Sequence, residues 1–277
     1  MSIKVRVFGS TSAGNATIVW DGTHALMVDC GLGVRYTDRC LREIGLGFDR
    51  TSGVFITHAH SDHASPTTLK RLVRGGARLY AHPGVMRALV FANLAAREAV
   101  RLGLYQPWGD GVFTLGRFTV RGFAVSHDAE GGCWGYTITA TPADAGAARR
   151  ITVATDVGCT DDALVGHFAD ADVIVIESNH DTAMLAASSR PGHLKARIRG
   201  DQGHLSNDQC AAFLARVLRG SSRMPAAVML AHISQECNTP ELAAAAIRAA
   251  LAAHAGAGSI TVHITHRETP SAIVALD

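Results

Sequence analysis

The sequence of 277 residues predicts a mixed α/β (α+β) protein in which several strands end along one edge of a sandwich. Segments typical of strands and of helices follow one another through the whole chain, and no linker-like stretch divides them. The hydrophobic fraction of 47% is sufficient for a sizeable core. Four predicted strands each deliver a side chain that can bind a metal ion: His58, His127, Asp156 and His232. We therefore expect a single domain over residues 1–277, with a metal site along one edge of its sheets.

The N-terminal part of the chain predicts strands joined by short turns. Charged and apolar residues alternate over 4–8, which is typical of a half-buried strand. Small hydroxyl residues and glycines over 9–15 fit either an anion-binding loop or a hairpin-type turn. Further strands are predicted at 16–20, 25–29 and 54–56, with a helix that ends near Gly45 between the last two.

The remaining elements are predicted from hydrophobic periodicity and from helix-start residues. Helices are expected at 66–74, 84–102, 161–167 and 240–254, and one begins at Ser206 or Asn207. Strands are expected at 79–81, twice within 112–125 around a turn at Gly116, and at 134–141, 150–155, 173–176, 227–230 and 259–264. Residues 142–148 are predicted to be a short surface loop, and the polar tract 188–203 has no predicted element.

Composition and charge exclude several classes of protein. The formal net charge is +2, so no overall field attracts nucleic acid. The six cysteines contain no Cys-x-x-Cys pair, which fits a reducing compartment rather than a disulfide framework. The N-terminus lacks the apolar core of a signal peptide, and no apolar run reaches the roughly 18 residues of a membrane helix. We expect a cytoplasmic protein with no membrane partner; the sequence does not indicate an oligomeric state.

The most specific stretch is Thr57-His58-Ala59-His60-Ser61-Asp62-His63, directly after the apolar run 54–56. Alternate side chains of an extended segment face the same way, so His58 and His60 can converge on one point. Asp62 and His63 follow a turn of the backbone and can face a second point nearby. Two borderline metal ions close together need this mixture of imidazole and carboxylate. The alternative is a solvated histidine-rich loop.

This stretch resembles the signature of the metallo-β-lactamase superfamily, whose four-layer αββα sandwich serves many substrates. Five motifs follow in the second half, at 177–181 (ESNHD), 194–198 (LKARI), 203–207 (GHLSN), 232–234 (HIS) and 238–240 (NTP). Their order resembles the YycJ/WalJ group of nuclease-like proteins, which is related to ribonuclease Z and the phosphodiesterase PhnP. The resemblance runs from Gly9 to about Leu242. It departs at Cys237, where asparagine is expected.

The resemblance implies two divalent metal ions per chain, with a bridging water or hydroxide as the nucleophile. The ligands would form three sets: His58, His60 and His127 at one metal; Asp62, His63 and His232 at the other; Asp156 between them. Taken alone, Asp156 could instead be a turn aspartate, and His127 and His232 core histidines. Imidazole and carboxylate suit zinc, which we expect, and also manganese or iron.

Two residues are expected to act in the reaction. Asp62 is placed at the second metal. The resemblance implies that His204 lies at the scissile phosphate, where it stabilises charge or protonates the leaving oxygen; helix capping is the alternative. Contacts with substrate are expected from a wider set: Ser10, Ser12, Asn15, His180, Lys195, Arg197 and Asn238. The first three would receive a terminal phosphate, and the two basic residues would bind backbone phosphates unless their tract is merely solvated.

These features predict a metal-dependent hydrolase of phosphodiesters. Ribonuclease Z grips transfer RNA with a long arm, and the short interval between His127 and Asp156 leaves no room for one. We therefore expect a nuclease that acts on DNA, as an exonuclease from the 5′ end. The alternative is a hydrolase of a small cyclic phosphodiester, ester or lactone. A redox protein is disfavoured because the chain has no room for a flavin domain.

Overall fold

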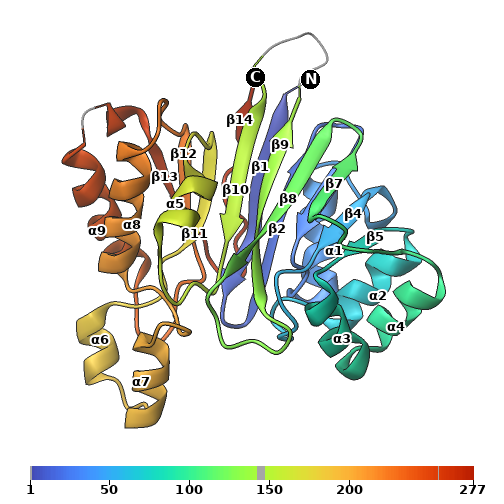
Figure 1. The fold of residues 1–277 in the computed structure, drawn as a ribbon, viewed down its shortest axis with the longest axis horizontal. Helices are drawn as coiled ribbons and strands as arrows, with labels where there is room; N and C mark the ends of the chain where they lie inside the picture. Colours follow the sequence, from blue (N-terminus) through green and yellow to red (C-terminus); the bar gives the residue numbers. More distant parts are fainter. Residues whose placement is uncertain (1, 142–146, 255) are drawn as a thin grey trace.

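The computed structural model describes residues 2–141, 147–254 and 256–277, and in it two mixed sheets pack face to face (Figure 1). The strands of the first sheet lie in the order β14 (Val274–Leu276), β1 (Ile3–Thr11), β2 (Gly14–Trp20), β3 (Ala25–Val28), β4 (Gly53–Phe55), β5 (Arg78–Tyr80) and β6 (Tyr105–Gln106). Those of the second lie in the order β13 (Thr261–Ile264), β12 (Ala227–Ala231), β11 (Val173–Glu177), β10 (Arg149–Ala154), β9 (Cys133–Ala140), β8 (Phe118–Val125) and β7 (Val112–Leu115).

Helices cover the outer face of each sheet (Figure 1). On the first sheet lie α1 (Val34–Glu43), α2 (Pro66–Arg74), α3 (Pro83–Ala92) and α4 (Leu94–Arg101), with the 3-10 turn Phe48–Arg50. On the second lie α5 (Asp162–Phe168), α8 (Asn207–Arg219) and α9 (Pro240–Ala252), with the 3-10 turn Ala257–Ser259. Two further helices, α6 (Thr182–Ala187) and α7 (Gly192–Arg199), project from the sandwich. Among the described residues, no helix is long and apolar enough to span a membrane.

The core has three layers, as the predicted four-layer αββα sandwich requires. Strand β11 shows why, because its successive side chains point to opposite faces. Val173 and Val175 pack between the two sheets, whereas Ile174 and Ile176 pack against the helices outside. All four are fully buried, which is why this strand is a continuous apolar run in the sequence. The predicted fold is confirmed.

Some local predictions were wrong. The helix expected over 84–102 is broken at Asn93, whose extended backbone ends α3 and whose side chain accepts from Ala95 N to start α4. The polar tract 188–203 contains helix α7, and the strands β6 and β14 were not predicted. Residues 9–15 form a β-hairpin between β1 and β2, so the turn alternative is right. Of the predicted loop 142–148, residues 142–146 lie outside the described residues.

The strands that carry the predicted metal residues all end at one edge of the sandwich, which we call the metal edge. Strands β10, β11 and β12 run parallel, so their carboxyl ends meet there. Three residues just after strand ends have positive φ angles: Asp29 (59°), Asp156 (56°) and His232 (51°). Such left-handed backbone is uncommon outside glycine and costs conformational energy, so the surrounding structure must hold these three residues in place.

Candidate metal centre

Three histidines from both sheets form the first group of possible ligands. His58 and His60 follow β4, and His127 follows β8. Their ligand atoms lie within 4.8 Å of one another. His58 Nε2 is 2.9 Å from His60 Nδ1, and the two rings are nearly perpendicular, at 82°. These imidazoles therefore converge on one point, as the alternation of an extended segment predicts.

A second group is formed by Asp62, His63 and His232, whose ligand atoms also lie within 4.8 Å of one another. Asp156 stands between the two groups. Its Oδ2 is 3.0 Å from His63 Nε2, and its Oδ1 is 3.6 Å from both His127 Nε2 and His232 Nε2. The structure thus brings all seven predicted metal residues together at the metal edge.

The donor atoms of this cluster fit divalent metal ions. Asp156 Oδ2 and His232 Nε2 are buried and make no hydrogen bond of acceptable geometry with the described residues. Leaving such atoms unpaired costs about 1–3 kcal/mol each, and native proteins rarely do so. Imidazole nitrogen and carboxylate oxygen are ligands that zinc, manganese and iron accept. Metal ions held between the two groups would satisfy both atoms.

Two carboxylates, which sequence reasoning did not assign, contact the Nδ1 atoms of two of these histidines. Asp29 Oδ2 is 2.7 Å from His63 Nδ1, and Glu177 Oε1 is 2.7 Å from His232 Nδ1. A carboxylate at Nδ1 fixes the tautomer that turns Nε2 towards a metal. Each carboxylate lies at the end of an apolar strand, β3 or β11, and that position was the signal available in the sequence.

Without a metal ion, the buried groups shift one another's pKa values. Burial alone would lower the pKa of His232, but the nearby Asp156 and Asp62 carboxylates and the hydrogen bond with Glu177 raise it to about 10. Burial would raise the pKa of Asp62, but the neighbouring imidazoles of His232 and His63 hold it below its usual value. A metal ion must therefore displace a proton from His232, so metal affinity increases as pH rises.

His204 lies between the metal cluster and the surface. Its ring centroid is 5.1 Å from those of His127 and His232. Its Nδ1 is 2.8 Å from Glu177 Oε1, and although burial opposes protonation, this carboxylate raises the pKa of His204. The helix-capping alternative is wrong, because Ser206 caps α8 with a complete capping box.

Four of the predicted substrate-binding residues are buried behind the cluster. Ser10 Oγ donates to Asn15 Oδ1 at 2.7 Å and accepts from His232 N at 2.8 Å, and Asn15 Nδ2 lies 3.0 Å from His63 Nε2. Asn238 Nδ2 donates to the carbonyl oxygens of Ser178 and Asn179. These three side chains brace the site. His180 is also buried, and burial lowers its pKa to about 4.

The other three predicted substrate residues lie nearer the surface. Ser12 is exposed at the tip of the β1–β2 hairpin. Lys195 Nζ donates to the carbonyl of Ala186 at 2.7 Å, within the α6–α7 segment. Arg197 makes a two-pronged ion pair with Asp128, at 2.5 and 2.9 Å. Of these three, Ser12 and Arg197 line a cavity beside the cluster.

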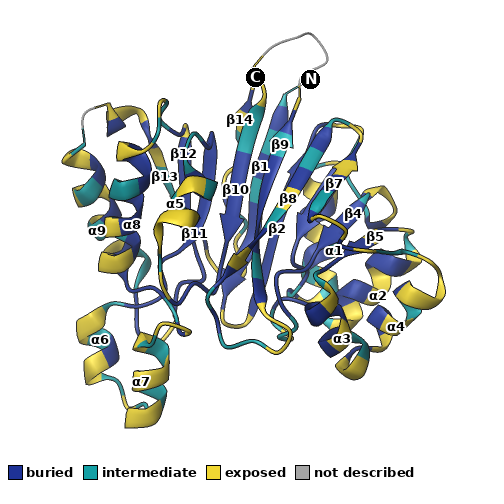
Figure 2. Ribbon diagram, viewed as in Figure 1, coloured by how far each residue is buried: buried dark blue, intermediate teal, exposed yellow. Residues whose placement is uncertain are grey.

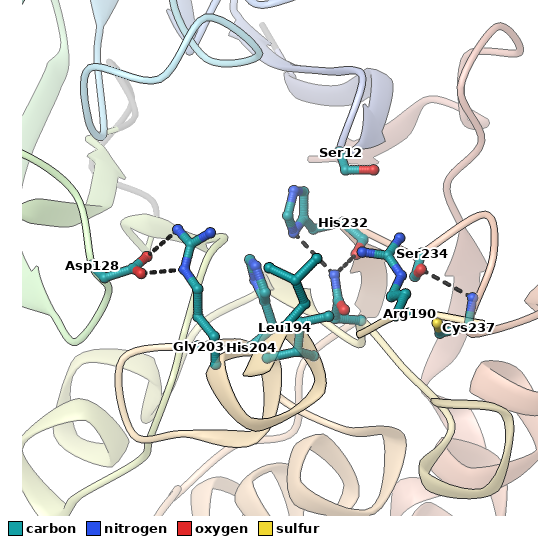
Figure 3. Close-up of a pocket in the computed structure, with 12 residues that line it drawn as sticks. Ser12, Asp128, Arg190, Leu194, Gly203, His204, His232, Ser234 and Cys237 are labelled. Atoms are coloured by element: carbon teal, nitrogen blue, oxygen red, sulfur yellow. Dashed lines mark hydrogen bonds and ion pairs between the residues drawn. The ribbon is translucent and has the colours of Figure 1, made fainter. Parts of the chain in front are cut away.

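That cavity measures about 140 Å³ and opens next to His204 and His232 (Figure 3). It is walled by residues from α7, from the segment that joins α6 to α7, from the β1–β2 hairpin and from the segment after β12. Arg190, which sequence reasoning missed, lines it together with Arg197 and Ser234. A small cavity with guanidinium and hydroxyl groups beside a metal cluster suits a phosphate-bearing molecule.

Comparison with known proteins relates the chain to a family and to named enzymes. A model described as a beta-lactamase superfamily domain matches residues 24–233. The exodeoxyribonuclease YycJ of Bacillus anthracis is 31% identical over 246 residues, which cover 88% of this chain and 87% of that protein. The exodeoxyribonuclease WalJ of Streptococcus pneumoniae is 29% identical over 250 residues, which cover 88% of this chain and 86% of that one.

Solved structures share the fold at lower identity. The metallo-β-lactamase fold protein YhfI of Bacillus subtilis superposes with a TM-score of 0.68 at 15% identity, over 99% of this chain and 100% of that one. The short form of human tRNase Z gives 0.61 at 17% identity, over 99% of each chain. A diphosphatase of the PhnP family gives 0.60 at 15%, over 100% of this chain and 98% of the other.

The family model and the sequence relatives show the family, and the structural neighbours share its fold. The predicted resemblance to the YycJ/WalJ group, and through the fold to ribonuclease Z and PhnP, is confirmed. The matched family model spans more than half of the 277 residues. This protein therefore belongs to the metallo-β-lactamase superfamily of metal-dependent hydrolases.

Proposed function

We propose that this protein is a dinuclear metal-dependent phosphodiesterase that degrades DNA as an exonuclease from the 5′ end. The observation that carries the proposal is the cavity beside the metal cluster, because two guanidinium groups, Arg190 and Arg197, line it. Guanidinium groups match phosphate oxygens in charge and geometry. The names of the YycJ and WalJ relatives, both exodeoxyribonucleases, support DNA as the substrate.

The proposed ligands divide as the two groups of the cluster do. One metal ion would be held by His58, His60 and His127, the other by Asp62, His63 and His232, and Asp156 would bridge them. We propose zinc, with manganese or iron as alternatives, because all three accept imidazole and carboxylate. When bound, such ions acidify a water molecule and offset the charge that develops on the phosphate. Because both sheets supply ligands, we propose that residues 1–277 act as one domain.

The side chains of this chain have distinct roles in the proposed reaction. Asp62 keeps its carboxylate ionised at neutral pH, because the neighbouring imidazoles of His232 and His63 lower its pKa. His204 is oriented by Glu177 and carries a proton at neutral pH more readily than an ordinary histidine. We assign to His204 the transfer of that proton to the leaving oxygen, which makes the leaving group a neutral hydroxyl.

A panel assay tests the function. The purified protein, supplied with zinc or manganese, is offered 5′-phosphorylated duplex and single-stranded DNA, precursor transfer RNA and bis-p-nitrophenyl phosphate, with Asp62→Ala as the control. We expect DNA to shorten from the 5′ end and the control to be inactive. Clean 3′ trimming of the RNA with intact DNA would contradict the DNA assignment.

The second candidate is a hydrolase of a small cyclic phosphodiester, ester or lactone. The small volume of the cavity, about 140 Å³, favours it, because so little space suits a small molecule better than an extended strand. The same panel separates the two candidates when a cyclic mononucleotide and a lactone are added. Rapid cleavage of one of these with both nucleic acids intact would replace the exonuclease proposal.

A further inference from the structure

The α6–α7 segment, residues 182–199, contributes little to the core of the protein. Helix α7 buries none of its eight residues, and α6 buries only Leu185. Figures 1 and 2 show the pair projecting from the metal edge, with much of its surface exposed. Most helices in proteins are stabilised by packing an apolar face on a core, which α7 lacks. Its inner side instead forms a wall of the cavity, through Leu194, Arg197 and Ile198.

The two arginines of the cavity differ in what they have left to bind. Arg197 is held by Asp128 in a two-pronged ion pair, in which Nε and Nη2 each donate to one carboxylate oxygen, so its charge is largely compensated. Arg190 forms an ion pair with Glu236, in which Nη2 lies 2.9 Å from Oε2, and both side chains are partly exposed. Its Nε is buried and has no hydrogen-bond partner among the described residues. Arg190 therefore offers a buried donor without a partner among the described residues, and its charge is compensated less completely than that of Arg197.

Hydroxyl groups complete the surroundings of Arg190. Ser234 Oγ accepts from Cys237 N at 3.1 Å, which leaves its own proton for an oxygen in the cavity. Ser12 approaches from the opposite side, at the hairpin tip (Figure 3). The metal-edge residues His204 and His232 line the same cavity. A guanidinium with two hydroxyls can bind an anion while a neighbouring phosphate lies at the metal cluster.

We propose that Arg190, with Ser234 and Ser12, is a subsite for the terminal 5′-phosphate of a DNA strand. This inference rests on the proposed function. A terminal phosphate monoester carries a charge of about −1.5 to −2 at neutral pH, so it attracts a guanidinium more strongly than an internal phosphodiester does. Glu236 shields Arg190 until the phosphate displaces it. The subsite therefore selects phosphorylated ends.

The proposed hydrolysis leaves a shortened strand that is again a substrate. The oxygen of water bonds to the phosphorus of the first phosphodiester, the bond from that phosphorus to O3′ breaks, and a proton passes to O3′. The first nucleotide leaves with its 5′-phosphate and a 3′-hydroxyl. The shortened strand carries a new 5′-phosphate that fits the subsite again. Reactions that supply this enzyme must therefore leave 5′-phosphates, as hydrolytic nicking of the P–O3′ bond does.

The test compares oligonucleotides of one sequence with a 5′-phosphate or a 5′-hydroxyl. For the wild type we expect kcat/KM to be higher with the phosphate by about tenfold or more, a difference of ~1.4 kcal/mol. Arg190→Gln should remove most of this preference through a higher KM for the phosphorylated strand, and Arg190→Lys should keep part of it. Glu236→Gln should act in the opposite direction and lower that KM.

Controls keep the outcomes distinct. Arg101→Gln removes an exposed arginine that pairs with Glu98 on α4, and it should match the wild type throughout. Metal content and thermal midpoint show whether Arg190→Gln is folded. If it is not folded, the KM of Glu236→Gln for the phosphorylated strand tests the subsite instead. A wild type that cleaves both ends equally, or an unchanged preference in Arg190→Gln and Glu236→Gln, overturns the subsite but not the exonuclease. A wild type that cleaves no DNA overturns the proposed function itself.

Discussion

Glu177 Oε1 is hydrogen-bonded to His232 Nδ1 at 2.7 Å, and the same oxygen is 2.8 Å from His204 Nδ1. Its other oxygen accepts from Val157 N at 2.7 Å, next to Asp156. One buried carboxylate thus fixes a proposed metal ligand, the proposed proton donor and the turn that carries the proposed bridge. The histidines in return hold the pKa of Glu177 at about 2, against the effect of burial.

Replacing Asp62 should abolish turnover without unfolding the protein. Asp62 lies at the metal edge with a partly exposed side chain, so Asp62→Ala removes no core contact. We expect a folded metal-free protein whose thermal midpoint is somewhat lower, because the ion pairs of Asp62 with His63 and His232 are lost, and no detectable phosphodiester hydrolysis. Calorimetry and a bis-p-nitrophenyl phosphate assay check this, and ordinary activity with normal metal content would contradict the assignment.

Removing His204 should impair the chemistry but leave the metals in place. His204 touches Glu177 and does not cap α8, so we expect His204→Ala to keep the fold and metal content. Losing a general acid should lower kcat by about 10²-fold or more. A substrate with a p-nitrophenolate leaving group needs less protonation and should lose less. Equal losses on both substrates would argue for a positioning role instead.

The backbone at Gly31 leaves no room for a side chain. A Cβ there would lie 1.6 Å from the carbonyl oxygen of Asp62, so Gly31→Ala must displace the loop that carries four proposed ligands. We expect reduced metal content, lost activity and a stability loss of about 1–3 kcal/mol. Gly33→Ala is the matched control, because a Cβ at Gly33 meets nothing within 4 Å. Equal behaviour of both variants would disprove the expectation.

Metal removal should loosen the protein, because both sheets supply proposed ligands. Elemental analysis of protein purified without chelator should give about two equivalents of metal per chain. A metal present at ~100 times its Kd stabilises the fold by ~2.7 kcal/mol per site. We therefore expect the thermal midpoint to fall on chelation and to recover with zinc. A reproducible content near one, unchanged by added metal, would falsify the dinuclear site.

The metal-free protein should lose stability as pH rises above neutrality. The pKa of His232 is raised from its ordinary 6.5 to about 10, so the protonated form stabilises the fold below pH 6.5. This contribution disappears as pH increases through about 10. As pH is raised from 6.5 to about 10, the thermal midpoint of the chelated wild type should therefore fall more steeply than that of chelated His232→Asn. Parallel curves would show that His232 is not protonated in the folded chain.

The sequence predicted the elements whose signal is local. The apolar run of β11 indicates a buried strand within a few residues, and the motif from His58 to His63 indicates metal binding over a similarly short stretch, so both can be predicted from the sequence. Strand β14 does not, because its three residues become a strand only by pairing with β1, where Val5 faces Val274. Helix α7 lacks an apolar stripe, so periodicity could not find it.

The candidate site shows the same division. Its ligand residues are of types that bind metals, and their order matches a known pattern. The supporting contacts depend on distance in space rather than in sequence: Glu177 meets His232 across 55 residues, and Asp29 meets His63 across 34. Likewise, the side chains of Ser10 and Asn15 turn out to support the histidines because the hairpin places them beneath the cluster.

The pairing of β1 with β14 has a practical consequence for handling this protein. Ile3 faces Leu276 in that antiparallel pair, so the two chain ends lie side by side (Figure 1). Strand β1 then runs the length of the sheet to the hairpin tip at Ser12, at the metal edge. A fusion partner, an affinity tag or a solid support attached at either end is therefore held at the far pole, where it leaves the approach to the metal edge open. Neighbouring ends also allow a short peptide to join them and a new break to be opened in a surface turn.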